Sequence, residues 1–351
     1  MDAWADSPPD RSASPQSCRG CVPLTFLADT RRVREMNSFP KPVIDSMADR
    51  AMRLHHMLWH TARDNWMVLT PEQQEVFHHH GWEPPRPSLT APDPVTGKRD
   101  IEFNNGSGED FLFMHRQMIA AVNEILAELG DPQYPRVEGW PTVPSPEDTA
   151  YPVPPPFDIP GDTGTAEAIR SAKTQEKFNQ IRAWEAEFTD PAKLRQMTLG
   201  RLGARIEFGI HNTMHLRWSA QMPEYRPGGD EFSIDPRWDD ASYNWLADTY
   251  SAHVNPIFWK LHGWVDARID DWMAAKELTG PVPWSFDPPW SGPVGHDPHR
   301  HPVAGLVVQA HPGNGEAAAL QSILGGMETT VEHLKRAGVG EPARFPVSDD
   351  A

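Results

Sequence analysis

The chain has 351 residues and a formal net charge of −17, which disfavours nucleic acid and anionic membranes as partners. Hydrophobic residues make up 38% of it, enough for a core, while its 37 prolines predict long irregular segments. It has no apolar run of about 18 residues and no apolar signal core at the N-terminus, so we expect a cytoplasmic protein without a membrane span.

The first part of the chain alternates helical patterns with loops. Residues 1–40 are rich in Ser, Pro and Arg and predict a loosely ordered leader, which holds the lone pair Cys18 and Cys21. Apolar residues at helical spacing predict helices over 42–63, 70–80 and 112–129. The second of these begins with a capping-box pattern, Thr70-Pro71-Glu72-Gln73, and stops at Gly81. Residues 83–108 read as a loop.

The rest of the chain follows the same alternation. Residues 132–163 are Pro-rich, and we expect them to wrap the core partly as polyproline. Further helices are predicted over 165–187, 204–216, 240–252, 258–276 and 315–336. Residues 222–238 and the tail from 280 onward are rich in Pro and Gly. The sequence therefore predicts a mainly α fold, with pairs of helices facing each other around a central site.

Histidines at helical spacing supply the chemistry. His211 and His215 lie four residues apart, so a helix places both imidazoles on one face, where they can hold one metal ion. A third, His262, lies in the apolar helical pattern Asn255-Pro256-Ile257-Phe258-Trp259-Lys260-Leu261-His262. Imidazole ligands without a thiolate or carboxylate suit copper, zinc, iron or nickel.

This pattern resembles the tyrosinase family of type 3 copper proteins. In that family the second copper ion is held by a His-x-x-x-His pair and by a His in an Asp-Pro-x-Phe-aromatic-x-x-His-x-x-x-Asp motif. The chain matches with Pro256, Phe258, Trp259, His262 and Asp266, and has Asn255 in place of the family's first Asp. The resemblance covers roughly 70–275 and implies a tyrosinase-like helical bundle with long Pro-rich loops around a central di-metal site. It divides the chain into a leader (1–40), a copper domain (41–280) and a C-terminal extension (281–351).

The site of the first copper ion matches the family less well. Phe111-Leu112-Phe113-Met114-His115-Arg116 resembles its motif and implies His115 as a ligand. The preceding His of the motif is absent, because Asn105 and Gly106 stand at its place. Upstream, His80 before Gly81 is the expected first ligand. The missing ligand stays open between His78, His79 and a second i, i+4 pair, His56 and His60, which could hold the ion with His115.

Two further residues are candidates for proton transfer. The resemblance implies that Glu207 and Asn212 orient a water molecule that accepts the proton of a phenol. Asp266 is expected to bond backbone or Arg side chains. A His-x-x-His-x-His cluster, His296, His299 and His301, lies in the Pro-rich tail and reads as a surface loop, with a copper-loading site as the alternative.

The resemblance implies an oxidoreductase that binds two copper ions and uses O2 to hydroxylate or oxidise a phenolic or o-aminophenolic small molecule, in specialised biosynthesis. The missing ligand near Asn105 supports an alternative: a protein of this fold that has lost one copper site and acts as a mono-metal enzyme or as a binding or scaffold protein. The sequence leaves the substrate, the choice between hydroxylation and oxidation, and the oligomeric state open.

Overall fold

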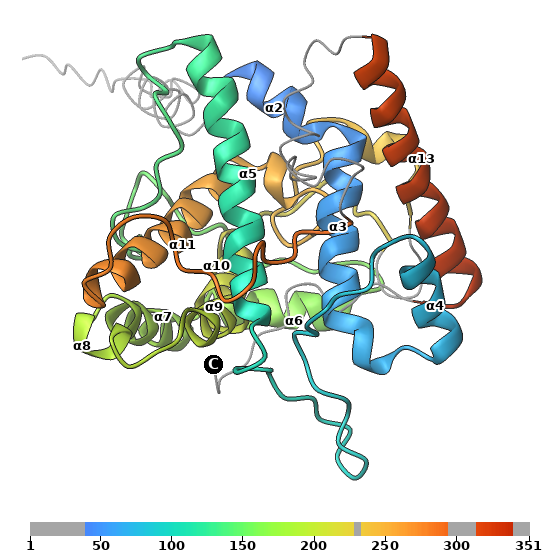
Figure 1. The fold of residues 1–351 in the computed structure, drawn as a ribbon. Helices are drawn as coiled ribbons and strands as arrows, with labels where there is room; N and C mark the ends of the chain where they lie inside the picture. The colour runs from blue at the N-terminus through green and yellow to red at the C-terminus, as the bar shows by residue number, and fades with distance from the viewer. Residues whose placement is uncertain (1–38, 228–232, 294–313, 340–351) are drawn as a thin grey trace, which may run out of the picture. The chain divides into compact units, whose positions relative to one another are not determined.

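The computed structural model describes residues 39–227, 233–293 and 314–339, which fold into helices joined by long loops (Figure 1). These residues contain no strand, and their one isolated antiparallel bridge pairs Leu89 with Ile101. The predicted mainly α class is therefore confirmed. None of the helices within these ranges is long and apolar enough to cross a membrane.

The predicted helix over 42–63 is two helices, α2 (Lys41–Ala48) and α3 (Arg50–Asn65). Asp49 between them has extended backbone angles, and its side chain accepts a hydrogen bond from the Ala51 N–H, which begins α3. Helix α4 (Pro71–His79) begins with both hydrogen bonds of the predicted capping box, between Thr70 and Gln73.

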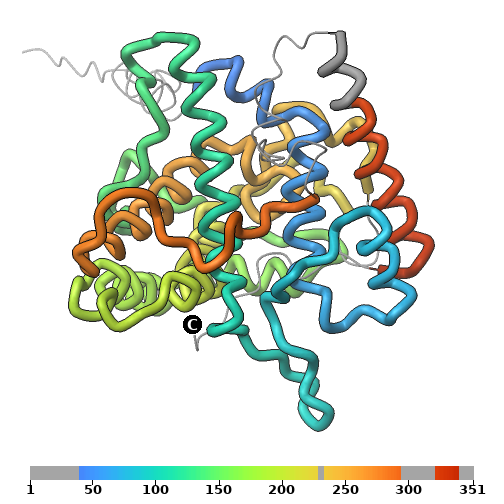
Figure 2. The backbone as a smooth tube through the Cα atoms, viewed as in Figure 1, coloured from blue at the N-terminus to red at the C-terminus, as the bar shows by residue number. Residues whose placement is uncertain are grey.

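Helix α5 (Ser107–Leu129) begins five residues before its predicted start. Gly106 adopts a φ of +90°, which L side chains rarely tolerate, and turns the chain into the helix. His115 consequently lies in the third turn of α5. The residues before this helix form an extended loop folded back on itself (Figure 2), in which the Thr90 N–H donates to the Asp100 carbonyl over 2.9 Å.

The predicted helix over 165–187 is also divided, into α6 (Thr163–Ala172) and α7 (Gln175–Phe188), because Thr174 caps a new start. Beyond α8 (Pro191–Leu194), three segments continue one another: α9 (Leu199–Ile206), the π-helical η2 (Glu207–His211) and α10 (Asn212–Trp218). Helix α11 (Pro256–Ala275) begins at Asn255, whose side chain accepts from the Ile257 N–H. Asparagine therefore supplies the N-cap here.

The helix predicted over 240–252 is wrong. The chain forms only short 3-10 turns there, η3 (Pro236–Asp239) and η4 (Ala252–Val254). Its carbonyl groups accept hydrogen bonds from side chains of other elements: Leu246 from His215, Thr249 from His56 and Tyr243 from Arg53. These tertiary bonds replace the i→i−4 bonds that a helix would need.

The C-terminal helix α13 (Asn314–Arg336) was predicted and packs against α3 and α4 (Figure 1). Arg50 at the start of α3 donates to Glu328, and Gln73 of α4 donates to the Ala337 carbonyl. A continuous apolar core extends from Val43 to Val339 and includes residues of all the long helices. The helices that carry the predicted histidines contribute residues to this core.

Candidate metal centre

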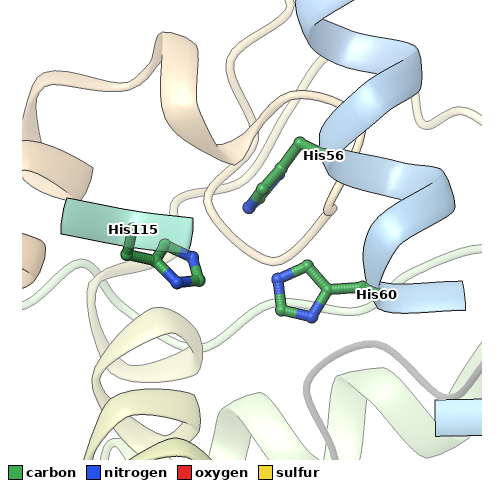
Figure 3. A group of neighbouring side chains, drawn as sticks. All are labelled: His56, His60 and His115. Carbon is green, nitrogen blue, oxygen red and sulfur yellow. The ribbon is translucent and has the colours of Figure 1, made fainter. Parts of the chain in front are cut away.

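Three buried imidazoles from two helices form a first group. His56 and His60 lie one turn apart on α3, and His115 faces them from α5 (Figure 3). One nitrogen from each ring lies within 4.8 Å of those of the other two. The three side chains are 1–4% exposed, so bulk water does not solvate them. This is the i, i+4 pair that the sequence left open, now joined to His115.

A second group lies beside the first. His211 and His215 follow each other across η2 and α10, and His262 approaches from α11. The Nε2 atom of His262 is 3.3 Å from Nε2 of His211 and 3.2 Å from Nε2 of His215. Ligands about 2.0–2.1 Å from one tetrahedral ion are about 3.3 Å apart, so these spacings fit a shared ion.

The two groups adjoin. His115, His211 and His262 also bring one nitrogen each within 4.8 Å of one another, and the rings of His115 and His262 stack with centroids 4.3 Å apart. His115 therefore belongs to the first group and also lies within reach of two members of the second. Paired metal ions in proteins lie about 3.5–4 Å apart, so ligands of neighbouring ions are expected to come this close.

Hydrogen bonds to carbonyl oxygens fix the tautomers of four rings. The Nδ1 atoms of His56, His115 and His215 face the backbone carbonyls of Thr249, Phe111 and Leu246. That of His211 faces the Asn212 side-chain oxygen at 2.8 Å. Since a carbonyl oxygen only accepts, each Nδ1 carries the proton and each Nε2 presents a lone pair.

These Nε2 lone pairs are buried hydrogen-bond acceptors, and the ring protons of the site cannot satisfy all of them. The Nε2 atoms of His56 and His115 have no hydrogen-bond partner among the described residues. His262 can donate its one Nε2 proton to only one of the two acceptors, His211 and His215, that face it. A cation at each group would satisfy these atoms, so the donor set fits metal ions.

Burial keeps the histidines neutral. It lowers the pKa of His56 to about 4 and that of His211 to about 3. It takes the pKa values of the remaining four well below 6.5, namely those of His60, His115, His215 and His262. Neutral imidazole is the form that binds metal ions.

Glycine contacts bring the histidine-bearing helices together. A Cβ added at Gly203 of α9 would lie 2.1 Å from the Gly108 carbonyl oxygen of α5, so the two backbones touch. A Cβ on Gly263, next to His262, would lie 2.5 Å from the Gly139 Cα. These contacts set the separation of α5 from α9 and seat α11 against the Pro-rich segment 132–163.

Glu207 and Asn212 lie beside the centre, each engaged by another residue. Both carboxylate oxygens of Glu207 accept from the Arg63 guanidinium, at 2.5 and 3.0 Å, and both residues are buried. Desolvation raises the pKa of Glu207 to about 7 against the pull of Arg63. The Asn212 oxygen accepts from His211, which makes it an orienting group for that ring.

His80, the expected first ligand, is not brought to the centre. It ends α4, and its Nε2 contacts Nδ1 of His333 at 3.1 Å. His78 pairs with Glu83 at the surface. Asn105, at the place of the missing ligand, accepts from the Ser107 N–H and helps start α5. The i, i+4 spacing of His56 and His60 was the sequence signal for the histidines that join His115 here.

Sequence reasoning did not single out His253. This side chain in η4 is fully buried, and its Nδ1 lies 3.3 Å from that of His56. It follows no helical spacing with another histidine, so only tertiary structure reveals it. Asp266 was expected to bond an Arg side chain, and its oxygen accepts from Arg116 at 2.6 Å. The tail cluster His296, His299 and His301 lies outside the described residues.

Aromatic residues separate the first group from solvent. The Trp59 ring packs 5.0 Å from His60 and 5.9 Å from His115, and the Trp290 ring stacks on it with centroids 6.1 Å apart. The backbone N–H of Trp290 donates to the Asp110 carboxylate, while the His55 ring donates to the Ser291 carbonyl. Residues 290–291 thus bond to Asp110 of α5 and to His55 of α3.

Comparison with known proteins assigns no family to the chain. No family model matches it. A segment of 94 residues is 30% identical to the NRPS-like tryptophan epimerase fscC of Fusarium equiseti. The match spans 23% of this chain and 6% of that much longer protein. The chain is, on its own structure, a mainly helical protein with two overlapping buried histidine triads that could hold metal ions.

Proposed function

We propose that the chain is a copper oxidoreductase of the tyrosinase type, which uses O2 to oxidise a phenolic or o-aminophenolic small molecule. The observation that carries this proposal is the pair of adjoining all-imidazole groups, with His115 within reach of both. One ion would be held by His56, His60 and His115, and the other by His211, His215 and His262. The motif around His262 supports copper rather than zinc at these positions.

Local charge also supports copper. Three buried carboxylates around the helices of the centre are paired with arginines, as Glu207–Arg63, Asp110–Arg86 and Asp248–Arg226. No carboxylate belongs to either triad in the described residues. A desolvated set of neutral ligands disfavours a high ionic charge, so it suits Cu(I) better than a pair of divalent ions.

The chemistry is a balanced oxidation. A bound copper pair would supply the electron transfer that reduces O2. Two catechols then become two o-quinones as one O2 becomes two waters, or one phenol and one O2 give one o-quinone and one water. The chain's residues would hold the ions, exclude water through Trp59 and Trp290, and keep the imidazoles neutral. Glu207, whose pKa is about 7, would exchange a proton near neutral pH.

Copper content tests the proposal. The wild-type chain, reconstituted and desalted, is expected to retain two copper ions and to develop an intense near-ultraviolet band when peroxide is added. His60→Ala and His215→Ala should each lose an ion and the band. His78→Ala is the matched control, since this exposed histidine pairs with Glu83. His80→Ala should keep the band. Equal copper in His60→Ala and wild type would overturn the assignment.

A single-ion site is the competing function. It is favoured by the overlap of the triads, because His115, His211 and His262 alone could hold one ion. In that case one copper per chain would be retained, His60→Ala would keep it, and no near-ultraviolet band would develop. The same measurement therefore separates the two functions.

A further inference from the structure

A separate pair of neighbouring imidazoles lies away from the buried centre, where α4 and α13 pack together. His80 Nε2 and His333 Nδ1 face each other at 3.1 Å, with ring centroids 5.2 Å apart. Both side chains are partly exposed, so ions in solution can reach them. His79 lies beside them, with its ring 4.9 Å from that of His80.

The spacing of the two nitrogens suits a shared ion. Two ligands at about 2.0–2.1 Å from a metal are about 2.9 Å apart at a right angle and about 3.3 Å apart at the tetrahedral angle. The observed 3.1 Å lies between these values. Burial, with His79 and His333 nearby, lowers the pKa of His80, so its lone pair is available at neutral pH.

We propose that His80 and His333 form a separate site for one divalent transition-metal ion of the zinc, nickel or copper(II) class, which fastens α13 to α4. Imidazole is a preferred ligand of these ions. Two protein ligands leave the other positions to water. The site is therefore expected to fill only when the metal ion is well supplied, and to release it readily.

The ion would strengthen contacts that already hold α13. That helix packs on α3, which carries His56 and His60, and Arg50 of α3 pairs with Glu328 of α13. An ion bound to folded protein but not to free helix shifts the equilibrium toward the docked state. Metal supply would thus control how firmly the C-terminal helix covers α3 and α4.

Zinc binding tests the site in the full chain. Equilibrium dialysis against Zn²⁺ is expected to show one more zinc per chain in wild type than in His333→Asn, which can still hydrogen-bond His80. His78→Ala should match wild type. Amide hydrogen exchange in residues 321–339 should slow roughly tenfold when free Zn²⁺ is about ten times the dissociation constant. His333→Asn should lose this response.

Two results would overturn the proposal. Equal zinc stoichiometry in wild type and His333→Asn would mean that the pair is only a hydrogen bond. An equal loss of zinc in His78→Ala would mean adventitious binding by the surface histidines of α4. Because the readout is a difference in zinc between variants, it does not depend on copper at the buried centre or on the near-ultraviolet band.

Discussion

The two histidine groups are built differently. In the second group, His262 Nε2 lies 3.2 Å from Nε2 of His215 and 3.3 Å from Nε2 of His211. The spacing of His211 and His215 and the motif around His262 can both be recognised in the sequence. In the first group one nitrogen from each of the three rings lies within 4.8 Å of the other two, and Nε2 of His56 and of His115 has no hydrogen-bond partner in the described residues. The difference teaches that helix packing lets His262 hydrogen-bond to its neighbours, whereas it leaves Nε2 of His56 and of His115 as buried acceptors that an ion would satisfy.

The largest effect is expected where both groups depend on one contact. Gly203→Ala places a Cβ 2.1 Å from the Gly108 carbonyl, and neither backbone can yield as a side chain would. Overpacking costs about 1–3 kcal/mol where neighbours can shift. We expect a larger loss here, enough to abolish the cooperative urea transition.

Gly325→Ala is its matched control. A Cβ at this glycine of α13 meets nothing within 4 Å, so we expect a stabilisation of about 0.5–1 kcal/mol. A Gly203→Ala protein that unfolds like wild type would contradict the role given to the α5–α9 contact.

Arg63 connects the elements that carry the two groups. It lies on α3, which carries His56 and His60, and it pairs with Glu207, which lies in η2 four residues before His211. Arg63→Met leaves the Glu207 carboxylate buried without its partner, so we expect about 3–5 kcal/mol of destabilisation in urea unfolding. The double variant Arg63→Met with Glu207→Gln removes the charge and should recover most of the loss. Additive losses in the double variant would show that the pair is not coupled.

Low pH should weaken the metal-free protein through both groups. His56 and His211 have folded-state pKa values near 4 and 3, below the ordinary 6.5. A lowered folded pKa contributes stability that is present above about pH 6.5 and is lost as the pH falls toward 4 and 3. We expect each to contribute on the order of 1–3 kcal/mol to this loss.

The measurement is the urea midpoint of copper-free protein, followed from pH 7.5 down to about pH 4.5. The lower limit lies about two pH units below the ordinary pKa of histidine. Glu207 acts in the opposite sense. Its raised pKa favours folding below about pH 4.5 and loses that contribution as the pH rises through about 7. Glu207→Gln should therefore steepen the loss of stability on acidification. An unchanged profile would argue against the raised value.

Asn212 orients a ligand in the second group only. Asn212→Leu removes the side-chain acceptor of the His211 Nδ1–H, which sits 2.8 Å away. Loss of such an orienting partner typically costs about 10–100-fold in metal affinity. Competition with a copper chelator should show this at one of the two ions, with Asn179→Ser as the exposed control. A loss shared equally by both ions would break the distinction between the groups.

The smallest effect is expected at Asn105. Asn105→His places a histidine at the position where the sequence motif lacks one, yet His56 and His60 already accompany His115. Copper content should not rise. Loss of the hydrogen bond from the Ser107 N–H to Asn105 should cost about 0.5–2 kcal/mol. A gain of bound copper would show that the first group is incomplete.

Local sequence determined the helices that have clear signals at their ends. The capping box at Thr70 fixed the start of α4, and Asn255 with Pro256 fixed that of α11. Breaks at Asp49 and Thr174 were missed, since each is an N-cap within a continuous apolar pattern. Spacing also placed His211 and His215 on one helical face, because the helical period is a property of the backbone.

Tertiary structure decided the rest. It brings His56 and His60 of α3 to His115, whereas His80 at the end of α4 contacts His333 of α13. It also left 240–252 without a helix, since the carbonyls of that segment orient His56 and His215. These outcomes depend on residues far apart along the chain. The hydrogen bonds and glycine contacts that select them exist only once the helices have packed.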